Sequence, residues 1–208
     1  MEIGIIGSGH IGGTLTRRLS SLGHDVAVTN SRGPQSLTDL AAETGARAVS
    51  LEEAVQGAEL VVVAIPLKAV PQLPASLFDG KLVVDANNYY PQRDGDVAEL
   101  LDRSLSSSRW TADHLKGARV VKAFNNIQAA HLMDAGKPAG TPDRIGLPVA
   151  GDDEDAKRVV MGIVEELGFD PVDAGTLDES WRQQPDTPVY GTDRDADGVR
   201  EGLAAARP

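Results

Sequence analysis

The sequence predicts an α/β fold, in which helices wind on both sides of a mostly parallel sheet of about eight strands. Short apolar runs alternate with helical segments along the chain, and this alternation is typical of doubly wound sheets. Several runs, including residues 60–65, are apolar at every position, as strands buried on both faces of a parallel sheet are. A glycine-rich turn joins the first apolar run to the first amphipathic helix.

The first strand and helix surround this turn. The strand stops at Gly7, and Gly7, Gly9 and Gly12 then fall in the spacing G-x-G-x-x-G. In such a turn the first glycine permits the bend, the second lets the backbone approach a pyrophosphate, and the third lets the helix pack close to the strand. The helix N-terminus offers free N–H groups and a positive dipole end to the phosphates. A Rossmann-type dinucleotide-binding fold follows, and the expected loop contacts are Gly7, Ser8, Gly9, His10 and Ile11.

The other elements follow from apolar patterning and from turn residues. After the first strand and helix, further strands are expected at residues 24–29, 47–49, 60–65, 82–85, 119–124, 145–150 and 169–172. Helices are expected from Pro34, at 51–58, around 97–105 and at 153–167, with a serine-rich loop before residue 117. Pro148 favours an edge or irregular position for its strand. We expect one domain over residues 1–208, with a core dinucleotide fold at 1–127 and added strands, a helix and a C-terminal segment at 128–208.

Composition limits the partners. The net charge of −11 and the pI of about 4.7 argue against nucleic acid or an anionic membrane as a partner. The chain has no cysteine, which excludes disulfides and thiolate chemistry. Its first strand begins at residue 2 without room for a signal peptide, and no apolar run is long enough to span a bilayer. We expect a cytoplasmic protein with small-molecule partners, either alone or as a homodimer.

The turn after the second strand predicts which dinucleotide binds. A carboxylate usually ends this strand in proteins that bind NAD, where it binds the ribose hydroxyls. Here the turn carries Asn30, Ser31 and Arg32, and no acid. Arg32 can bind a 2′-phosphate through a charge-assisted fork, and the two polar neighbours can add hydrogen bonds. The turn therefore favours NADP(H) over NAD(H), although an ordinary polar turn would use the same residues.

Later strand ends supply apolar and amide side chains. Ile65 and Pro66 follow one strand and suit a flat nicotinamide or ribose, whereas Asn87 and Asn125 follow two others. Ligands bind outside the carboxyl ends of strands in open α/β sheets, so these side chains are candidates for the nicotinamide carboxamide. Asparagine is also common in ordinary turns after strands, which is the structural alternative.

These segments resemble a known family, the NADP oxidoreductases that use the deazaflavin coenzyme F420. The resemblance rests on the glycine loop, the 30–32 turn, the 64–66 and 151–154 segments, the helix over residues 156–167 and the 173–175 segment. Residues 85–88 and 121–127 also resemble the oxidoreductase domain of transmembrane metalloreductases. The resemblance implies an eight-stranded Rossmann-type domain in which hydride passes between NADPH and a flavin or deazaflavin. The polar, proline-bearing segment after Gly175 departs from the apolar tail of the deazaflavin enzymes.

The sequence names no catalytic residue. Hydride transfer between two cofactors needs proximity and orientation more than an acid or base, whereas reduction of a carbonyl or imine needs a proton donor, for which His131 is a weak candidate. Trp181 could stack on a ring and Arg182 could bind an anionic tail. Two alternatives to the flavin or deazaflavin reductase stay open: a reductase of a small carbonyl or imine with a site completed by dimerisation, and an NADP-sensing module without enzymatic activity.

A possible metal motif in the tail has a simpler explanation. Residues 193–198 imitate the start of an EF-hand loop, but the twelfth position is Ala204, where a bidentate glutamate is required. A helix over residues 195–206 with acidic residues at its N-terminus accounts for the same pattern through the helix dipole. No metal site is expected.

Overall fold

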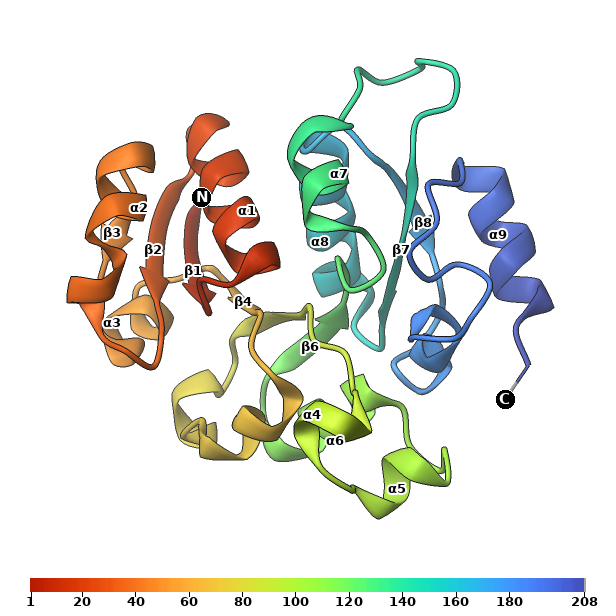
Figure 1. The fold of residues 1–208 in the computed structure, drawn as a ribbon, viewed down its shortest axis with the longest axis horizontal. Coiled ribbons are helices and arrows are strands. Elements are labelled where there is room, and N and C mark those ends of the chain that lie inside the picture. The colour runs from red at the N-terminus through yellow and green to blue at the C-terminus, as the bar shows by residue number, and fades with distance from the viewer. Residues whose placement is uncertain (208) are drawn as a thin grey trace.

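The computed structural model describes residues 1–207 and contains one eight-stranded sheet, which confirms the predicted fold class. Figure 1 shows β1 to β3 at one side of the molecule and β7, β8 and the C-terminal helix at the other. The strands lie in the order β3-β2-β1-β4-β5-β6-β7-β8. Their bounds are β1 Glu2–Ile6, β2 Asp25–Thr29, β3 Arg47–Ala48, β4 Leu60–Val63, β5 Leu82–Asp85, β6 Arg119–Lys122, β7 Gly146–Gly151 and β8 Asp170–Asp173.

The order in which strands are added to the sheet reverses between β1 and β4. Both strands pair in parallel with each other, while β2 and β3 extend to one side and β5 and β6 to the other. Such a switch point leaves a crevice at the carboxyl ends of the strands, where ligands bind in open α/β sheets. Only β7 runs antiparallel to its neighbour β6, and β8 then pairs in parallel with β7.

Helices cover both faces of the sheet. The α-helices are α1 His10–Ser21, α2 Thr38–Thr44, α3 Leu51–Gln56, α4 Pro91–Asp94, α5 Ala98–Leu101, α6 Ser107–His114, α7 Ala129–Asp134, α8 Glu154–Glu166 and α9 Ala196–Ala205. Short 3-10 helices are η1 Pro34–Leu37, η2 Leu67–Gln72, η3 Ala75–Phe78 and η4 Asp178–Gln183. Leucines of α1 and valines of α8 share one apolar core on one face, and α3 and the end of α6 pack into a second core on the other.

The connection between β5 and β6 differs from the prediction. The helix expected around residues 97–105 is only the four-residue α5, because Asp102 accepts from the Ser104 N–H and Arg103 takes a left-handed φ of 60°. The expected serine-rich loop holds only up to Ser106, because Ser107 and Ser108 already belong to α6. Ser106 caps that helix by accepting from the Arg109 N–H at 3.1 Å. His114 is the last residue of α6.

β7 is an interior strand, but its proline lies at an irregular position. Only Ala150 and Gly151 pair with β6, so Pro148 has no ladder partner on that side. There the Gln183 side chain donates to the Pro148 carbonyl at 3.1 Å. The predicted irregular position is therefore confirmed, and the edge position is wrong because β8 lies outside β7.

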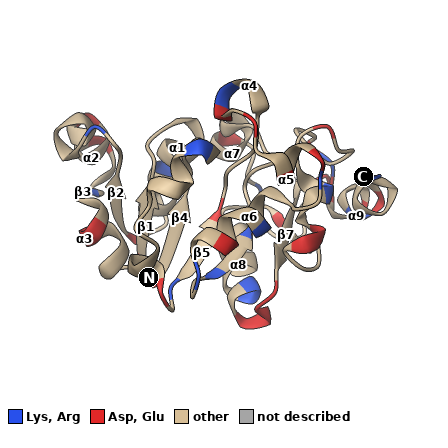
Figure 2. Ribbon diagram, turned by 90° about the horizontal axis from the view of Figure 1, so that it is seen from below, with Lys and Arg blue, Asp and Glu red and all other residues tan. Residues whose placement is uncertain are grey.

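Charged residues mark the helix ends. Figure 2 shows acidic residues, in red, on α3 and at one end of α8. Glu52 and Glu53 lie in the first turn of α3, and Glu154 and Asp155 in that of α8, where the helix dipole stabilises negative charge. Over residues 1–207, no helix combines the length and the apolar character needed to cross a membrane.

Candidate dinucleotide-binding site

The glycine loop has the geometry that the sequence predicts. Gly7 has a φ of 106°, and a Cβ there would lie 2.2 Å from the Ala64 carbonyl oxygen of the neighbouring strand end. A Cβ at Gly12 would lie 2.0 Å from the Gly7 oxygen, so α1 packs directly on the loop. By contrast, nothing lies within 4 Å of the position that a Cβ on Gly9 would occupy. The middle glycine is thus not required by internal packing, and it leaves open space above the loop.

A cavity of about 440 Å³ lies beside this loop at the carboxyl ends of β1, β2 and β4. This volume is within the range of small-molecule and cofactor pockets. Eight of the predicted contacts line it: Gly7, Ser8, Gly9, Asn30, Ser31, Arg32, Ile65 and Pro66. The structure therefore brings the glycine loop, the turn after β2 and the apolar end of β4 together around one space.

Asn30 organises the turn after β2. Its Nδ2 donates to Ser8 Oγ at 2.9 Å, which ties the turn to the glycine loop. Its Oδ1 accepts from the Arg32 N–H at 2.9 Å and from the Ser36 hydroxyl at 3.0 Å. Arg32 itself is exposed, and no carboxylate of residues 1–207 lies within 4.0 Å of its guanidinium. A cation without a counter-ion at the rim of this cavity fits a phosphate on the ligand.

His10 and Ile11 do not line the cavity. His10 is the exposed first residue of α1, and the Ile11 side chain packs against the main core. Because the first N–H groups of a helix have no intrahelical partner, these residues can meet a ligand only through their position at the N-terminus of α1.

Asn87 lies beneath the end of β4 and not in the cavity wall. It is 3% exposed, and its Oδ1 accepts from the Ile65 N–H at 2.8 Å. Its Nδ2 is buried and has no hydrogen-bond partner among the described residues. Such an unsatisfied donor costs free energy unless a ligand or water accepts from it. The residue holds the end of β4 and keeps one buried amide donor unsatisfied.

Asn125 is fully engaged by protein groups. Its Nδ2 donates to Asn88 Oδ1 at 3.0 Å and to the Gln183 carbonyl at 2.7 Å, and its Oδ1 accepts from Gln183 Nε2 at 3.0 Å. Asn125 therefore has no free amide atom in this conformation with which to make the predicted contact to the nicotinamide. The C-terminal segment, which the sequence left unplaced, covers this strand end instead.

A buried ion pair supports the same edge of the sheet. Lys122 Nζ lies 3.3 Å from Asp85 Oδ2, and both side chains are fully buried. Lys122 also donates to the Asn87 carbonyl, and Ser108 Oγ donates to Asp85 at 2.6 Å. Burial lowers the pKa of Lys122, while Asp85 acts in the opposite direction. Sequence reasoning missed this pair, although a lysine and an aspartate that interrupt two apolar strands were a usable signal.

Two tyrosine hydroxyls meet over the ends of β5 and β6, and sequence reasoning missed this pair too. Tyr90 and Tyr190 are hydrogen-bonded to each other, and the Arg93 guanidinium lies 4.8 Å from the centroid of the Tyr90 ring. The Gly191 N–H donates to the Asn126 carbonyl, which fixes Tyr190 beside the end of β6. Burial and the hydrogen bond to Tyr90 raise the pKa of Tyr190. The raised pKa keeps this hydroxyl in its neutral form, in which it can donate a hydrogen bond.

The other candidates have protein partners. His131 lies 2.9 Å from Asp193, and Arg182 donates to Glu179 at 2.8 Å and to the Ala174 carbonyl. Trp181 lines a different cavity, described below. The predicted C-terminal helix is confirmed as α9, and Asp195 caps it by accepting from the Gly198 N–H. These partners account for the residues that imitate a calcium loop.

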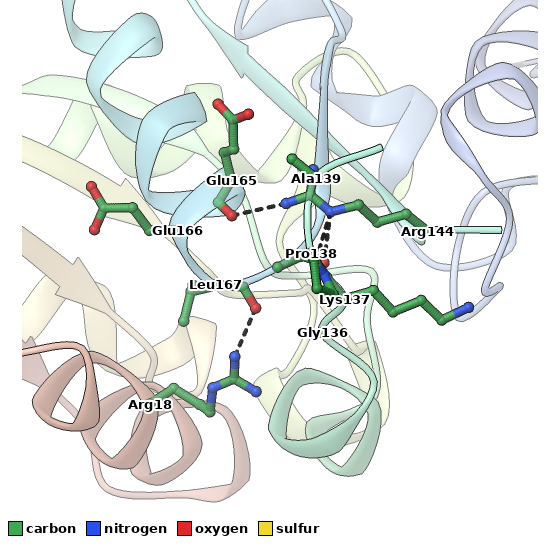
Figure 3. A pocket seen from close by; sticks show the side chains of 10 residues that line it. Arg18, Gly136, Lys137, Pro138, Ala139, Arg144, Glu165, Glu166 and Leu167 are labelled. Carbon is green, nitrogen blue, oxygen red and sulfur yellow. Dashed lines mark hydrogen bonds between the residues drawn. The ribbon is translucent and has the colours of Figure 1, made fainter. Parts of the chain in front are cut away.

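A third cavity has a structural explanation. Figure 3 shows Arg18 and Arg144 reaching the backbone at the end of α8. Arg18 donates to the Leu167 carbonyl at 2.7 Å, and Arg144 donates to the Glu165 carbonyl at 2.9 Å. Cations beside the free carbonyls of a helix C-terminus stabilise that end. The two arginines that line this cavity therefore stabilise the C-terminal end of α8. The cavity shares no residue with the dinucleotide cavity.

Comparisons with known proteins point to NADP-dependent oxidoreductases. Residues 2–89 match the family model described as NADP oxidoreductase coenzyme F420-dependent. Metalloreductase STEAP3 of Rattus norvegicus is 32% identical over 179 residues, covering 85% of this chain and 34% of that protein. The chain thus spans about a third of this relative's length.

Two further proteins match over most of both chains. The F420-dependent NADP reductase of Methanothermobacter thermautotrophicus is 27% identical over 215 residues, covering 91% of this chain and 87% of that protein. The crystal structure of a hypothetical protein of Sinorhizobium meliloti has 33% sequence identity and a TM-score of 0.79, covering 92% of this chain and 93% of that one. The resemblance inferred from the sequence is confirmed: residues 2–89 match this family model, and most of the chain is similar to an F420-dependent NADP reductase.

Proposed function

We propose that this chain binds NADP(H) in the cavity beside the glycine loop and transfers hydride between it and a flavin or deazaflavin. The convergence of the open Gly9 position with the Ser8–Asn30–Arg32 arrangement on one cavity carries this proposal. The pyrophosphate would lie at the N-terminus of α1, and Arg32 would bind the 2′-phosphate.

The nicotinamide half would extend toward the ends of β4 and β5. Ile65 and Pro66 offer an apolar surface there, and the unsatisfied Nδ2 of Asn87 offers a donor nearby. When bound, NADPH supplies the hydride. The protein's part is to orient the two reactants and exclude water, which requires no acid–base pair. The coenzyme named in the family description supports a planar, flavin-like acceptor.

Oxidation of NADPH by a panel of acceptors tests this proposal. The purified chain would be incubated with NADPH and separately with F420, FMN, FAD and small carbonyls, while oxidation of the cofactor is followed. Saturable turnover with F420 or a flavin supports the proposal. Tight NADPH binding without turnover on any acceptor would contradict it and would favour an NADP-sensing role.

The tyrosine pair favours a second candidate, an NADPH-dependent reductase of a small carbonyl or imine. In that reaction hydride passes to carbon, and the oxygen or nitrogen of the double bond takes up a proton. Either hydroxyl of the Tyr90–Tyr190 pair could donate it, and solvent would restore the proton. Tyr190→Phe should then lower kcat for a carbonyl at least tenfold while leaving turnover with a flavin within about twofold. Equal loss with both acceptors would assign the tyrosine a structural role.

A further inference from the structure

A second cavity, of about 330 Å³, lies between the β5–β6 connection and the C-terminal segment. It shares no lining residue with the dinucleotide cavity. The rings of Tyr89 and Trp181 both line it, and so does Leu101, whose 49% exposure is the largest of any large apolar residue in the described chain. Aromatic walls and an exposed leucine at a concave surface are typical of sites for flat apolar groups.

Two arginines add positive charge to this cavity. Arg103 and Arg207 line it, and within residues 1–207 neither has a carboxylate oxygen within 4.0 Å of its guanidinium. Nine of the fourteen arginines pair with an acid among the described residues, whereas Arg207 donates only to the Ala204 and Ala206 carbonyls. Asp186 is the one acidic residue of the lining, so the cavity retains a positive excess. A ligand with an anionic group would complete the pairing.

The backbone of this cavity is strained. Four non-glycine residues of the described chain have a positive φ, and two of them, Arg103 at 60° and Asp186 at 68°, line the cavity. Left-handed backbone at such residues costs about 1–3 kcal/mol each and clusters at ligand sites. Neither turn contains the glycine that would relieve the strain. Arg103 therefore combines a strained backbone with a guanidinium that has no acidic partner among the described residues.

We propose that this cavity is a second binding site, which takes a planar aromatic molecule bearing a carboxylate or phosphate. The ring packs against Trp181 and Tyr89, and Arg103 and Arg207 bind the anionic group. The site goes beyond the proposed hydride transfer, because its lining lies outside the dinucleotide cavity and needs no reaction to be occupied. Its residues also lie outside the region that matches the family model, apart from Tyr89 at its boundary.

Flavin fluorescence provides a direct test. FMN carries a phosphate, and riboflavin has the same ring without a phosphate. Each would be titrated against the chain in saturating NADP⁺. 2-Naphthoate, an aromatic carboxylate with a different ring, would serve as the competitor. NADP⁺ fills the dinucleotide cavity and cannot donate hydride. Stacking on Trp181 is expected to quench the flavin fluorescence with saturation, and 2-naphthoate is expected to reverse the quenching.

Variants of exposed arginines test whether the phosphate of FMN is bound in this cavity. Arg103→Gln combined with Arg207→Gln should weaken FMN binding about tenfold or more and riboflavin binding by less than about twofold. Arg194→Gln, an exposed arginine outside the cavity, is the matched control and should change neither. Trp181→Leu should remove the quenching, and thermal unfolding verifies that each variant folds.

Three results would overturn the assignment. These are the absence of saturable FMN quenching, FMN binding that NADP⁺ abolishes, and unchanged FMN affinity in the double arginine variant. Failure of the proposed oxidoreductase function gives a different result: NADPH would stay unoxidised in the separate acceptor assay, while the saturable FMN quenching in NADP⁺ would persist.

Discussion

Gly9 and Gly12 serve the same turn for different physical reasons. Gly9 caps α1 with a φ of −73°, which alanine adopts without strain, and its Cβ would project into open space. Gly12 has the Gly7 oxygen 2.0 Å from its Cβ position. We therefore expect Gly12→Ala to reduce the free energy of unfolding by about 1–3 kcal/mol, as overpacking does.

Gly9→Ala should separate binding from folding. The free energy of unfolding should change by less than about 1 kcal/mol. NADPH affinity should fall about tenfold or more, because the methyl group occupies the space through which a pyrophosphate approaches the loop. Chemical denaturation and calorimetric titration of NADPH measure the two quantities. Undiminished NADPH affinity would place the phosphates elsewhere.

Arg32 provides the test of cofactor choice. Arg32→Ala should weaken NADPH binding about 10- to 100-fold, because a charge-assisted contact to the 2′-phosphate is lost. NADH lacks this phosphate, so its affinity should change by less than about threefold. Arg47→Ala is the control, because Arg47 is an exposed arginine that pairs with Asp25 and does not line the cavity. Equal losses for the two cofactors would contradict the assignment.

At the scale of elements, Gln183 joins η4 to the segment after β6 and to the middle of β7. Its Nε2 donates to Asn125 and to the Pro148 carbonyl, and its side chain is fully buried. Gln183→Leu should therefore reduce the free energy of unfolding by about 1–3 kcal/mol and increase amide hydrogen exchange in the C-terminal segment. Gln128→Leu, at an exposed position, is the comparison. Unchanged exchange at the Gly191 N–H would show that the segment is held elsewhere.

The strands and the glycine loop could be predicted because their signals are local. Apolar runs mark β4, β5 and β6, and the spacing of Gly7, Gly9 and Gly12 belongs to one turn. The antiparallel direction of β7 could not be predicted, because it depends on how the chain returns after α7. α6 escaped prediction because its serines are buried by contacts with distant residues, such as Ser108 with Asp85.

For the candidate site too, local sequence patterns could be interpreted and contacts between distant segments could not. The predicted residues that line the candidate dinucleotide cavity come from short segments at the ends of β1, β2 and β4, so local sequence patterns were enough to place them together. The roles of Asn125 and Tyr190 depend on a C-terminal segment that returns over the sheet from more than fifty residues away in sequence. No local pattern encodes such a return.

At the scale of the whole molecule, cofactor binding should raise thermal stability. A ligand at 100 times its Kd stabilises the folded state by about 2.7 kcal/mol. For a chain of 208 residues this corresponds to a rise of about 5–10 °C in Tm. NADPH should produce this rise and NADH at the same concentration a smaller one, as differential scanning fluorimetry would measure. An equal rise with both would contradict the preference for the 2′-phosphate.

Two separate stretches of chain build the cavity beside the glycine loop and the cover over the neighbouring strand ends. The cavity beside the glycine loop is built entirely from residues 6–73, whereas the cover over the ends of β5 and β6 comes from the connection after β5 and from the C-terminal segment. Under the proposed function, substitutions in the cover would change which acceptor meets the cofactor without disturbing the glycine loop. A lineage of such proteins could acquire new acceptors by remodelling this cover, and exchange of residues 176–207 between relatives is a practical way to test altered specificity.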